Sequence, residues 1–237
     1  MHLGGTLRKT DRGYDFGVLA TYLTSLPADL SWEKAKPVDR MPGMVRDGGG
    51  ECVSPAEQRK YRMAVGKLMW FDRADCRFMK CRLAVRCGKA TTGDWANLKK
   101  LVRYIIGTAT QTTHVESVDL PAGQTPVGTV VVYSDSDWAG SSDRKSTSAH
   151  TVHVRLSRGY YPISAVTRRQ SCVALSSGEA ELAAAVGGMC EALGTYQVFL
   201  WLLGGVGLVP SALSVVGQVD IVLEEVSLHQ VEVDEVE

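Results

Sequence analysis

Three segments rich in β-branched and aromatic residues, followed by one long helical segment, restrict the possible folds of this chain more than any other feature. The strands are expected at residues 127–133, 148–156 and 160–166, and a short turn between the last two predicts a hairpin. The segment 176–205 predicts a helix, because bulky residues recur along it at alternating spacings of four and three. We expect this apolar face to pack in the core: Leu182, Val186, Met189, Leu193, Tyr196, Leu200 and Leu203. The order predicts an α/β domain with helices against a sheet.

The part of the chain before residue 127 shows helical rather than strand periodicity. Ser54, Pro55 and Glu57 fit a helix start, with a capping serine, a proline in the first turn and a glutamate three residues after the cap. A second helix is expected to begin near Asp94. Its basic residues lie off the apolar stripe, toward solvent or a ligand: Lys99, Lys100 and Arg103. Residues 1–50 are loosely patterned and end in a glycine-rich loop.

Charge is distributed unevenly, although the 26 basic and 26 acidic residues balance. Thirteen Lys or Arg residues lie between positions 59 and 103, against three aspartates, whereas residues 211–237 hold seven acids and no Lys or Arg. A basic segment of this kind predicts contact with a polyanion such as nucleic acid. The alternative is a solvated basic face on ordinary helices. A further strand is expected at 212–216, before the pattern decays into an acidic tail.

The cysteines and the apolar segments bear on the compartment. None of the six cysteines has a spacing typical of a zinc site, which predicts reduced thiols. The first residues lack the apolar core of a secretory signal, and the apolar run 199–209 is shorter than the ~20 residues that span a bilayer. We therefore expect a cytoplasmic or nuclear protein that is not secreted and has no membrane partner.

Two carboxylates one residue apart, Asp135 and Asp137, follow the first expected strand in the sequence YSDSDWAG. A calcium loop is excluded, because Ala139 stands where such a loop needs an oxygen ligand. Two interpretations stay open: a solvated turn after the strand, or a site in which Asp135 binds Mg²⁺. For a metal site the best partner is Glu181 in SSGEAEL, because Glu179 is expected to cap the start of the helix.

Several segments in a fixed order carry a family resemblance. YSDSDWAG with DRKSTSAHTV, then YPISAVTRRQ and VALSSGEAEL, resemble the ribonuclease H domain of copia-type LTR retrotransposon Pol polyproteins. Upstream, YRMAVGKLMWF and WANLKKLVRYIIGT resemble the segment between reverse transcriptase and ribonuclease H in that family. LGGTLRKTDRGYDF resembles the end of the reverse transcriptase, so no polymerase activity is expected of this chain.

The resemblance implies a fold and an activity. The fold is a ribonuclease H-like mixed sheet flanked by helices, incomplete at the C-terminus and preceded by a mostly helical connection segment. The implied divisions are a reverse transcriptase remnant (1–50), a basic helical connection (51–126), a partial ribonuclease H-like domain (127–218) and an acidic tail (219–237). The implied activity is endonucleolytic hydrolysis of the RNA strand of RNA–DNA hybrids with two Mg²⁺ ions, or Mn²⁺. An upstream reverse transcriptase is the implied partner in an intact polyprotein.

The resemblance also assigns residues. The catalytic and metal-binding acids are Asp135, Glu181 and Asp220, whereas Asp137 lies outside the metal shell and Trp138 packs beneath the site. The expected contacts to an RNA–DNA hybrid or another nucleic acid are basic: Lys99, Lys100, Arg103, Arg144, Lys145, Arg168 and Arg169. Asp220 lacks the sequence context of the family's third acid, and the segment with a fourth acid is absent. We therefore expect a truncated chain with weak or no nuclease activity; the alternative is a non-catalytic, nucleic-acid-binding remnant.

Overall fold

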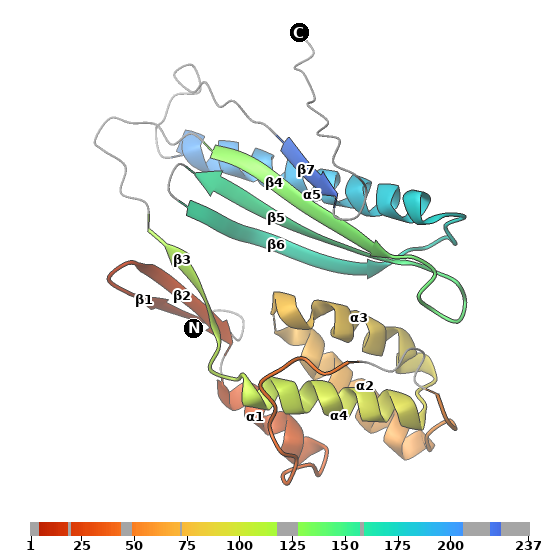
Figure 1. Cartoon of the computed structure of the whole chain (residues 1–237). Coiled ribbons are helices and arrows are strands. Elements are labelled where there is room, and N and C mark those ends of the chain that lie inside the picture. The colour runs from red at the N-terminus through yellow and green to blue at the C-terminus, as the bar shows by residue number, and fades with distance from the viewer. Residues whose placement is uncertain are drawn as a thin grey trace. The chain divides into compact units, whose positions relative to one another are not determined.

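The computed structural model describes residues 5–18, 20–43, 49–71, 73–117, 128–156, 159–205 and 219–223 (Figure 1). The chain forms two compact units, residues 1–115 and 116–237, and both strands and helices occur, as an α/β chain requires. The finer predicted boundaries stay predictions. The strand expected at 212–216 lies outside the described residues. Within the described part of the chain, no helix combines the length and the apolar character needed to cross a membrane.

In its described residues, the first unit combines four α-helices with a small sheet. Its elements in chain order are β1 (Gly5–Lys9), β2 (Gly13–Val18), α1 (Ala20–Asp29), α2 (Pro55–Trp70), a 3-10 turn (Ala74–Cys76), α3 (Arg77–Val85), a second 3-10 turn (Arg86–Gly88), α4 (Thr92–Gly107) and β3 (Thr112–Glu116). The strands lie in the order β1-β2-β3. The helices share one apolar core that includes Leu23, Leu26, Tyr61, Leu68, Leu98 and Leu101.

Reciprocal side-chain caps begin the two longest helices of this unit. At α2, the predicted cap is confirmed: the Glu57 N–H donates to Ser54 Oγ at 3.3 Å, and the Ser54 N–H donates to Glu57 Oε2 at 3.0 Å. At α4, Thr91 and Asp94 form the same pair, so the helix begins at Thr92 and Asp94 caps it from within the first turn. Each cap satisfies N–H groups that have no partner inside the helix, and a cap of this kind contributes about 1 kcal/mol.

Residues 5–18 form a hairpin and residues 20–29 a helix, where the sequence shows only loose patterning. The hairpin is tied to β3 by one polar cluster. Arg8 Nη2 donates to Asp15 Oδ2 at 2.6 Å, and His114 Nδ1 lies 2.7 Å from Asp15 Oδ1. The three residues come from β1, β2 and β3, and Asp15 is buried. Hydropathy alternation does not reveal these strands, because an acid occupies the buried position where the pattern requires an apolar residue.

This cluster predicts a pH-dependent contribution to stability. Hydrogen bonds first from Arg8 and then from His114 hold the pKa of the Asp15 carboxyl below its ordinary value of 3.8. A carboxyl with a lowered folded-state pKa stabilises the fold above its unfolded pKa, and the contribution disappears as the pH falls through the folded-state pKa. We expect Asp15→Asn to lower the melting temperature at about pH 6, and the difference to shrink steadily below about pH 4. Thermal melts of both proteins over this range measure it; a difference independent of pH would contradict the assignment.

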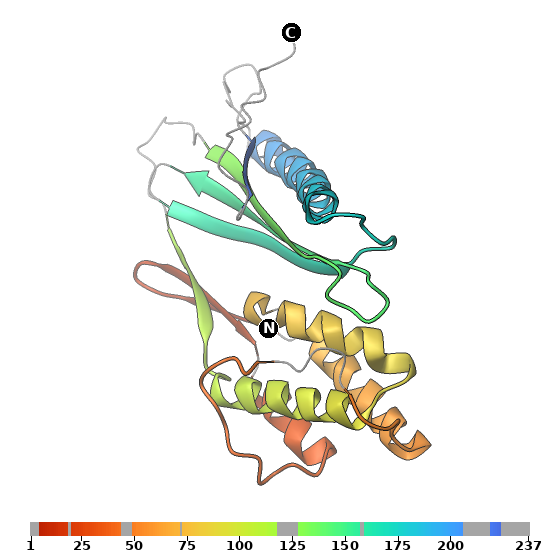
Figure 2. The ribbon, with the colours of Figure 1, turned by 45° about the vertical axis from the view of Figure 1, so that its right-hand side comes forward.

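The described part of the second unit is a four-stranded sheet with one long helix. Its elements are β4 (Gly128–Asp137), β5 (Thr147–Leu156), β6 (Gly159–Arg169), α5 (Ser177–Gly205) and β7 (Val219–Leu223). The strand order is β6-β5-β4-β7; β4, β5 and β6 are antiparallel, and β7 runs parallel to β4. The predicted β5–β6 hairpin is confirmed. Figures 1 and 2 both show α5 lying along one face of this sheet, so the chain crosses over that face between β6 and β7.

The face that α5 turns toward the sheet consists of small residues, which corrects the sequence prediction. Buried positions on the helix are Ala180, Ala184, Ala185, Gly188 and Ala192. The bulky stripe expected in the core is instead exposed over its first half, from 36% at Met189 to 65% at Leu182, with Val186 and Leu193 between them. Tyr196 does pack against the buried valines of the sheet. The side chains of the two remaining stripe positions, Leu200 and Leu203, lie outside the described ones.

The close approach of α5 to the sheet explains this orientation. A Cβ atom added at Gly188 would lie 2.7 Å from Val132 Cγ1, closer than real Cβ atoms come to other groups, and 3.3 Å from His150 Cβ, a tight contact. The helix backbone therefore rests directly on the side chains of β4 and β5. A leucine on this face would push the helix away from the sheet, because protein interiors are packed without spare volume.

Candidate functional site

The end of β4 meets the first turn of α5 at Ser136. The Ser136 backbone N–H donates to Asp135 Oδ1 at 2.7 Å and to Glu181 Oε1 at 3.2 Å, and Ser136 Oγ donates to the same Glu181 oxygen at 2.7 Å. The two carboxylate oxygens share one nitrogen, so they lie no farther apart than the sum of these two N···O distances. The structure thus brings together the first two acids predicted from the sequence, although they are 46 positions apart in the chain.

The pair formed by Asp135 and Glu181 is negatively charged and has no basic neighbour among the described residues. Among the described residues, no Lys or Arg forms an ion pair with Asp135 or Glu181, and the three hydrogen bonds from Ser136 are the ones that orient them. Two like charges held side by side without a basic neighbour repel each other, and a bound cation would relieve this repulsion. Carboxylate oxygens are the ligands that Mg²⁺ and Mn²⁺ prefer. No third His, Cys, Asp or Glu joins the pair within the described residues.

A tight turn follows Asp137, the last residue of β4, and does not belong to the carboxylate pair. The Asp137 carboxylate folds over Gly140, so that a Cβ atom added at Gly140 would collide with it. Ala139 has φ +49°, a left-handed conformation that costs energy for a residue with a side chain, and its N–H donates to Ser146 Oγ at 3.1 Å. Trp138 Nε1 donates to the Ala174 carbonyl at 3.3 Å, and the ring is 46% exposed.

The start of α5 differs in one bond from the expected capping box. The Glu179 N–H donates to Ser176 Oγ at 3.1 Å, as a capping serine requires. The Glu179 carboxylate, however, accepts from the Leu175 N–H at 2.6 Å, one residue before the expected partner. Glu179 is therefore engaged at the helix start, and Glu181 is the acid that faces β4.

The backbone of Asp220 lies away from the pair. In the parallel register between β4 and β7, Asp220 is the partner of Val131, and Leu223 is the partner of Ser134. Asp135 follows Val131 by four residues, which corresponds to about 13 Å of extended strand. The structure therefore does not place Asp220 beside Asp135 and Glu181.

The three basic residues of α4 contact the loop that precedes α2. Lys99 Nζ lies 5.5 Å from the centre of the Trp32 ring, Lys100 Nζ donates to the Gly43 carbonyl at 3.0 Å, and Arg103 Nε donates to the Lys36 carbonyl at 2.7 Å. The sequence places them toward solvent or a ligand; the structure shows that they hold this loop against the helix.

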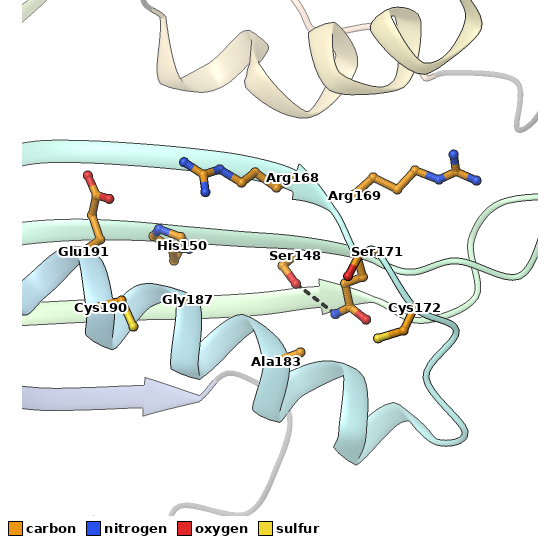
Figure 3. A pocket seen from close by; sticks show the side chains of 11 residues that line it. Ser148, His150, Arg168, Arg169, Ser171, Cys172, Ala183, Gly187, Cys190 and Glu191 are labelled. Carbon is orange, nitrogen blue, oxygen red and sulfur yellow. Dashed lines mark hydrogen bonds between the residues drawn. The ribbon is translucent and has the colours of Figure 1, made fainter.

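The other predicted basic contacts lie in the second unit. Arg144 and Lys145 belong to the β4–β5 loop, where Arg144 has φ +61° and the Lys145 N–H donates to Asp143 Oδ1 at 3.3 Å. Arg168 and Arg169 end β6 beside a cleft of about 410 Å³ between that strand and α5, and their side chains extend in opposite directions (Figure 3). Arg169 forms an ion pair with Asp143, and Arg168 is exposed.

Three polar residues around the carboxylate pair have no role in the sequence prediction: Ser136, Ser148 and Gln170. Ser136 stands between the two predicted aspartates, and Ser148 is its partner on β5. Gln170 Nε2 donates to Ser148 Oγ and to the Ala180 carbonyl, both at 2.9 Å. The only sequence signal for these roles is their position inside the segments YSDSDWAG, DRKSTSAHTV and YPISAVTRRQ; the contacts themselves depend on strand register.

The known proteins to which this chain is similar include two Pol polyproteins of one plant. The chain is 32% identical over 180 residues to the retrovirus-related Pol polyprotein from transposon RE2 of Arabidopsis thaliana, which covers 74% of this chain and 11% of that protein. It is also 32% identical over 167 residues to the retrovirus-related Pol polyprotein from transposon RE1 of the same plant, covering 68% and 10%. The chain thus spans about a tenth of the length of the curated relatives it matches. Neither a protein-family model nor a solved structure matches it.

Proposed function

The chain belongs to the retrotransposon Pol polyproteins, and from this premise we propose that its second unit is a ribonuclease H-like domain that acts on the RNA strand of RNA–DNA hybrids. The sheet order supports the proposal. Three antiparallel strands, β4, β5 and β6, are followed by a helix that crosses one face and by β7, which returns parallel to β4. A mixed sheet whose first three strands are antiparallel is what the resemblance of the sequence implies.

The observation that carries the proposal is the shared Ser136 N–H, because it holds the carboxylates of Asp135 and Glu181 near one another at the end of β4. These two carboxylates fit one divalent ion and would hold it. When bound, Mg²⁺ would supply an activated water and stabilise the leaving 3′ oxygen. A second ion needs further acidic ligands, which the described residues do not contribute. Asp220 would become the third acid only if β7 met β4 in a different register. We therefore expect slow hydrolysis.

Nucleic-acid binding is the second candidate, and one observation favours it. Arg168 is exposed at the end of β6, which pairs with β5. Arg144 and Lys145 lie in the loop between β4 and β5. Phosphate contacts from such residues need no metal and weaken steeply with added salt. A chain that retained them without a complete metal site would be a binding remnant. In an intact polyprotein, the proposed partner is an upstream reverse transcriptase.

Cleavage of a labelled hybrid by the purified chain tests the proposal. We expect slow loss of the RNA strand with Mg²⁺ or Mn²⁺, no loss with a chelator, and no cleavage of a DNA duplex of the same sequence. Salt-sensitive binding of the hybrid without cleavage, by protein that melts cooperatively, would contradict the nuclease proposal and support the binding remnant. A polymerase assay is not informative, because this segment is expected to hold no polymerase site.

A further inference from the structure

Gln170 connects three elements around the carboxylate pair. It follows the last residue of β6, and its backbone N–H donates to the Ser146 carbonyl at 2.9 Å, just before β5. Its side-chain Nε2 donates to Ser148 Oγ on β5 at 2.9 Å, the bond drawn dashed in Figure 3. The same Nε2 donates to the Ala180 carbonyl at the start of α5, also at 2.9 Å. One amide group therefore joins the end of the β5–β6 hairpin to the first turn of the helix.

Both anchors of this amide lead to Glu181. Ala180 is fully buried and directly precedes Glu181 in the first turn of α5. Ser148 pairs in register with Ser136, the residue whose N–H and hydroxyl hold the Glu181 carboxylate. The contacts thus form a ring that runs from Glu181 to Ser136, across to Ser148, through Gln170 to Ala180, and back to Glu181. Any movement of the helix start along β4 would break bonds on both sides of the ring.

The chemistry of the side chain suits this position. The two N–H groups of a primary amide reach acceptors on two different elements, which no hydroxyl or carboxylate of similar length can do. Within the described residues, Gln170 Oε1 is buried and accepts no hydrogen bond. A buried acceptor without a donor costs stability and so offsets part of what the two hydrogen bonds from Nε2 contribute.

We infer that Gln170 is a positioning residue for the metal-binding acids, and that it acts by fixing the first turn of α5 so that Glu181 meets Asp135 at Ser136. The inference rests on the proposed function, because it assumes that the two acids hold a divalent ion. Gln170 itself does not touch that ion. Residues that orient metal ligands typically change metal affinity by about 10–100-fold when they are replaced.

Titration of the full chain with Mn²⁺ alone, followed by the loss of the free-ion electron paramagnetic resonance signal, tests the inference. The main variant is Gln170→Met, which keeps the length of the side chain and removes both donors. We expect it to weaken Mn²⁺ binding by about 10-fold, with a melting temperature close to that of the wild type. Gln197→Met, an exposed glutamine farther along α5, is the matched control and should bind Mn²⁺ as the wild type does.

A second variant, Ser148→Ala, tests the same inference if Gln170→Met does not fold. Ser148→Ala removes one of the two anchors and leaves the helix contact in place, and we expect it to weaken Mn²⁺ binding by a smaller factor than Gln170→Met. Wild-type protein that fails to bind Mn²⁺ would overturn the proposed metal site and this inference together. Wild-type binding with an affinity unchanged in a folded Gln170→Met or Ser148→Ala would overturn the positioning role alone.

Discussion

Asp135→Asn and Glu181→Gln are each expected to reduce metal-dependent cleavage of an RNA–DNA hybrid by about 100-fold or more. Each substitution leaves the size of the side chain unchanged and removes one of the two negative charges that meet at Ser136. A bound divalent ion stabilises developing charge by several kcal/mol, and each 1.36 kcal/mol corresponds to about tenfold in rate. The described residues contribute only two acids to the site, so no third acid there can replace the metal ligand that each variant loses.

The controls for this experiment come from the same helix and the same substrate. Glu191→Gln makes the identical chemical change ten residues farther along α5, where the carboxylate accepts from Ser164 Oγ at 3.0 Å. We expect cleavage by this variant to stay within about threefold of the wild-type rate. Cleavage that survives in Asp135→Asn, or that falls equally in Glu191→Gln, would show that another place in the chain performs the hydrolysis. Single-turnover rates at saturating metal separate the chemical step from hybrid binding.

Gly107→Ala is expected to destabilise the first unit by about 1–3 kcal/mol. A Cβ atom at this position would overlap the backbone of Val38, with its nitrogen 2.9 Å and its carbonyl carbon 2.7 Å away. The neighbouring group is backbone, so it cannot rotate out of the way as a side chain can. The Val38 N–H also donates to the Arg103 carbonyl at 3.1 Å. A shift of the loop around Val38 would therefore break this hydrogen bond as well.

Gly66→Ala is the matched control for this prediction. Gly66 lies inside α2 in the same unit, and a Cβ atom there would meet nothing within 4 Å. Alanine in a helix interior is more favourable than glycine by roughly 0.5–1 kcal/mol, so this variant is expected to be more stable than the wild type. Urea unfolding curves of the three proteins measure both effects. Equal stability of Gly107→Ala and the wild type would mean that Val38 does not lie against this glycine.

Local features of the chain could be predicted from the sequence, and long-range contacts only where a motif marked them. The Ser54 cap and the β5–β6 hairpin depend on residues a few positions apart, so their patterns are visible in the sequence. The meeting of Asp135 with Glu181 depends on the packing of α5 on β4; the expected cap by Glu179 left Glu181 as the candidate partner, and the family resemblance then assigned both acids to one site. The contacts of Gln170 were missed, because a side-chain amide has no preferred partner until strand register and helix position are fixed.

The predicted orientation of α5, with its bulky stripe in the core, was wrong for a related reason. A helix with Leu182 and Leu193 on one stripe and alanines or glycines on the other has two faces that are both able to pack, and hydropathy ranks the bulky one first. The face with the small residues packs on the sheet, because the valines of the sheet already occupy the space between the two layers. The basic residues of α4 show a similar effect: no local pattern in the sequence indicates that Arg103 donates to the carbonyl of Lys36.

The small-residue face of α5 has a consequence for how this sequence tolerates mutation. Leu182, Val186 and Leu193 are bulky apolar residues of the helix, yet they are largely exposed, so polar replacements there should cost the fold of this unit little. In contrast, Gly188 has no room for an added methyl group beside Val132, and Ala184 is fully buried, so larger residues at these positions should be costly. Neutral substitutions that preserve the fold would therefore replace the apolar stripe first and retain the alanines and glycines. In a descendant that had drifted in this way, the surviving mark of the fold would be a pattern of small residues rather than one of hydrophobic residues.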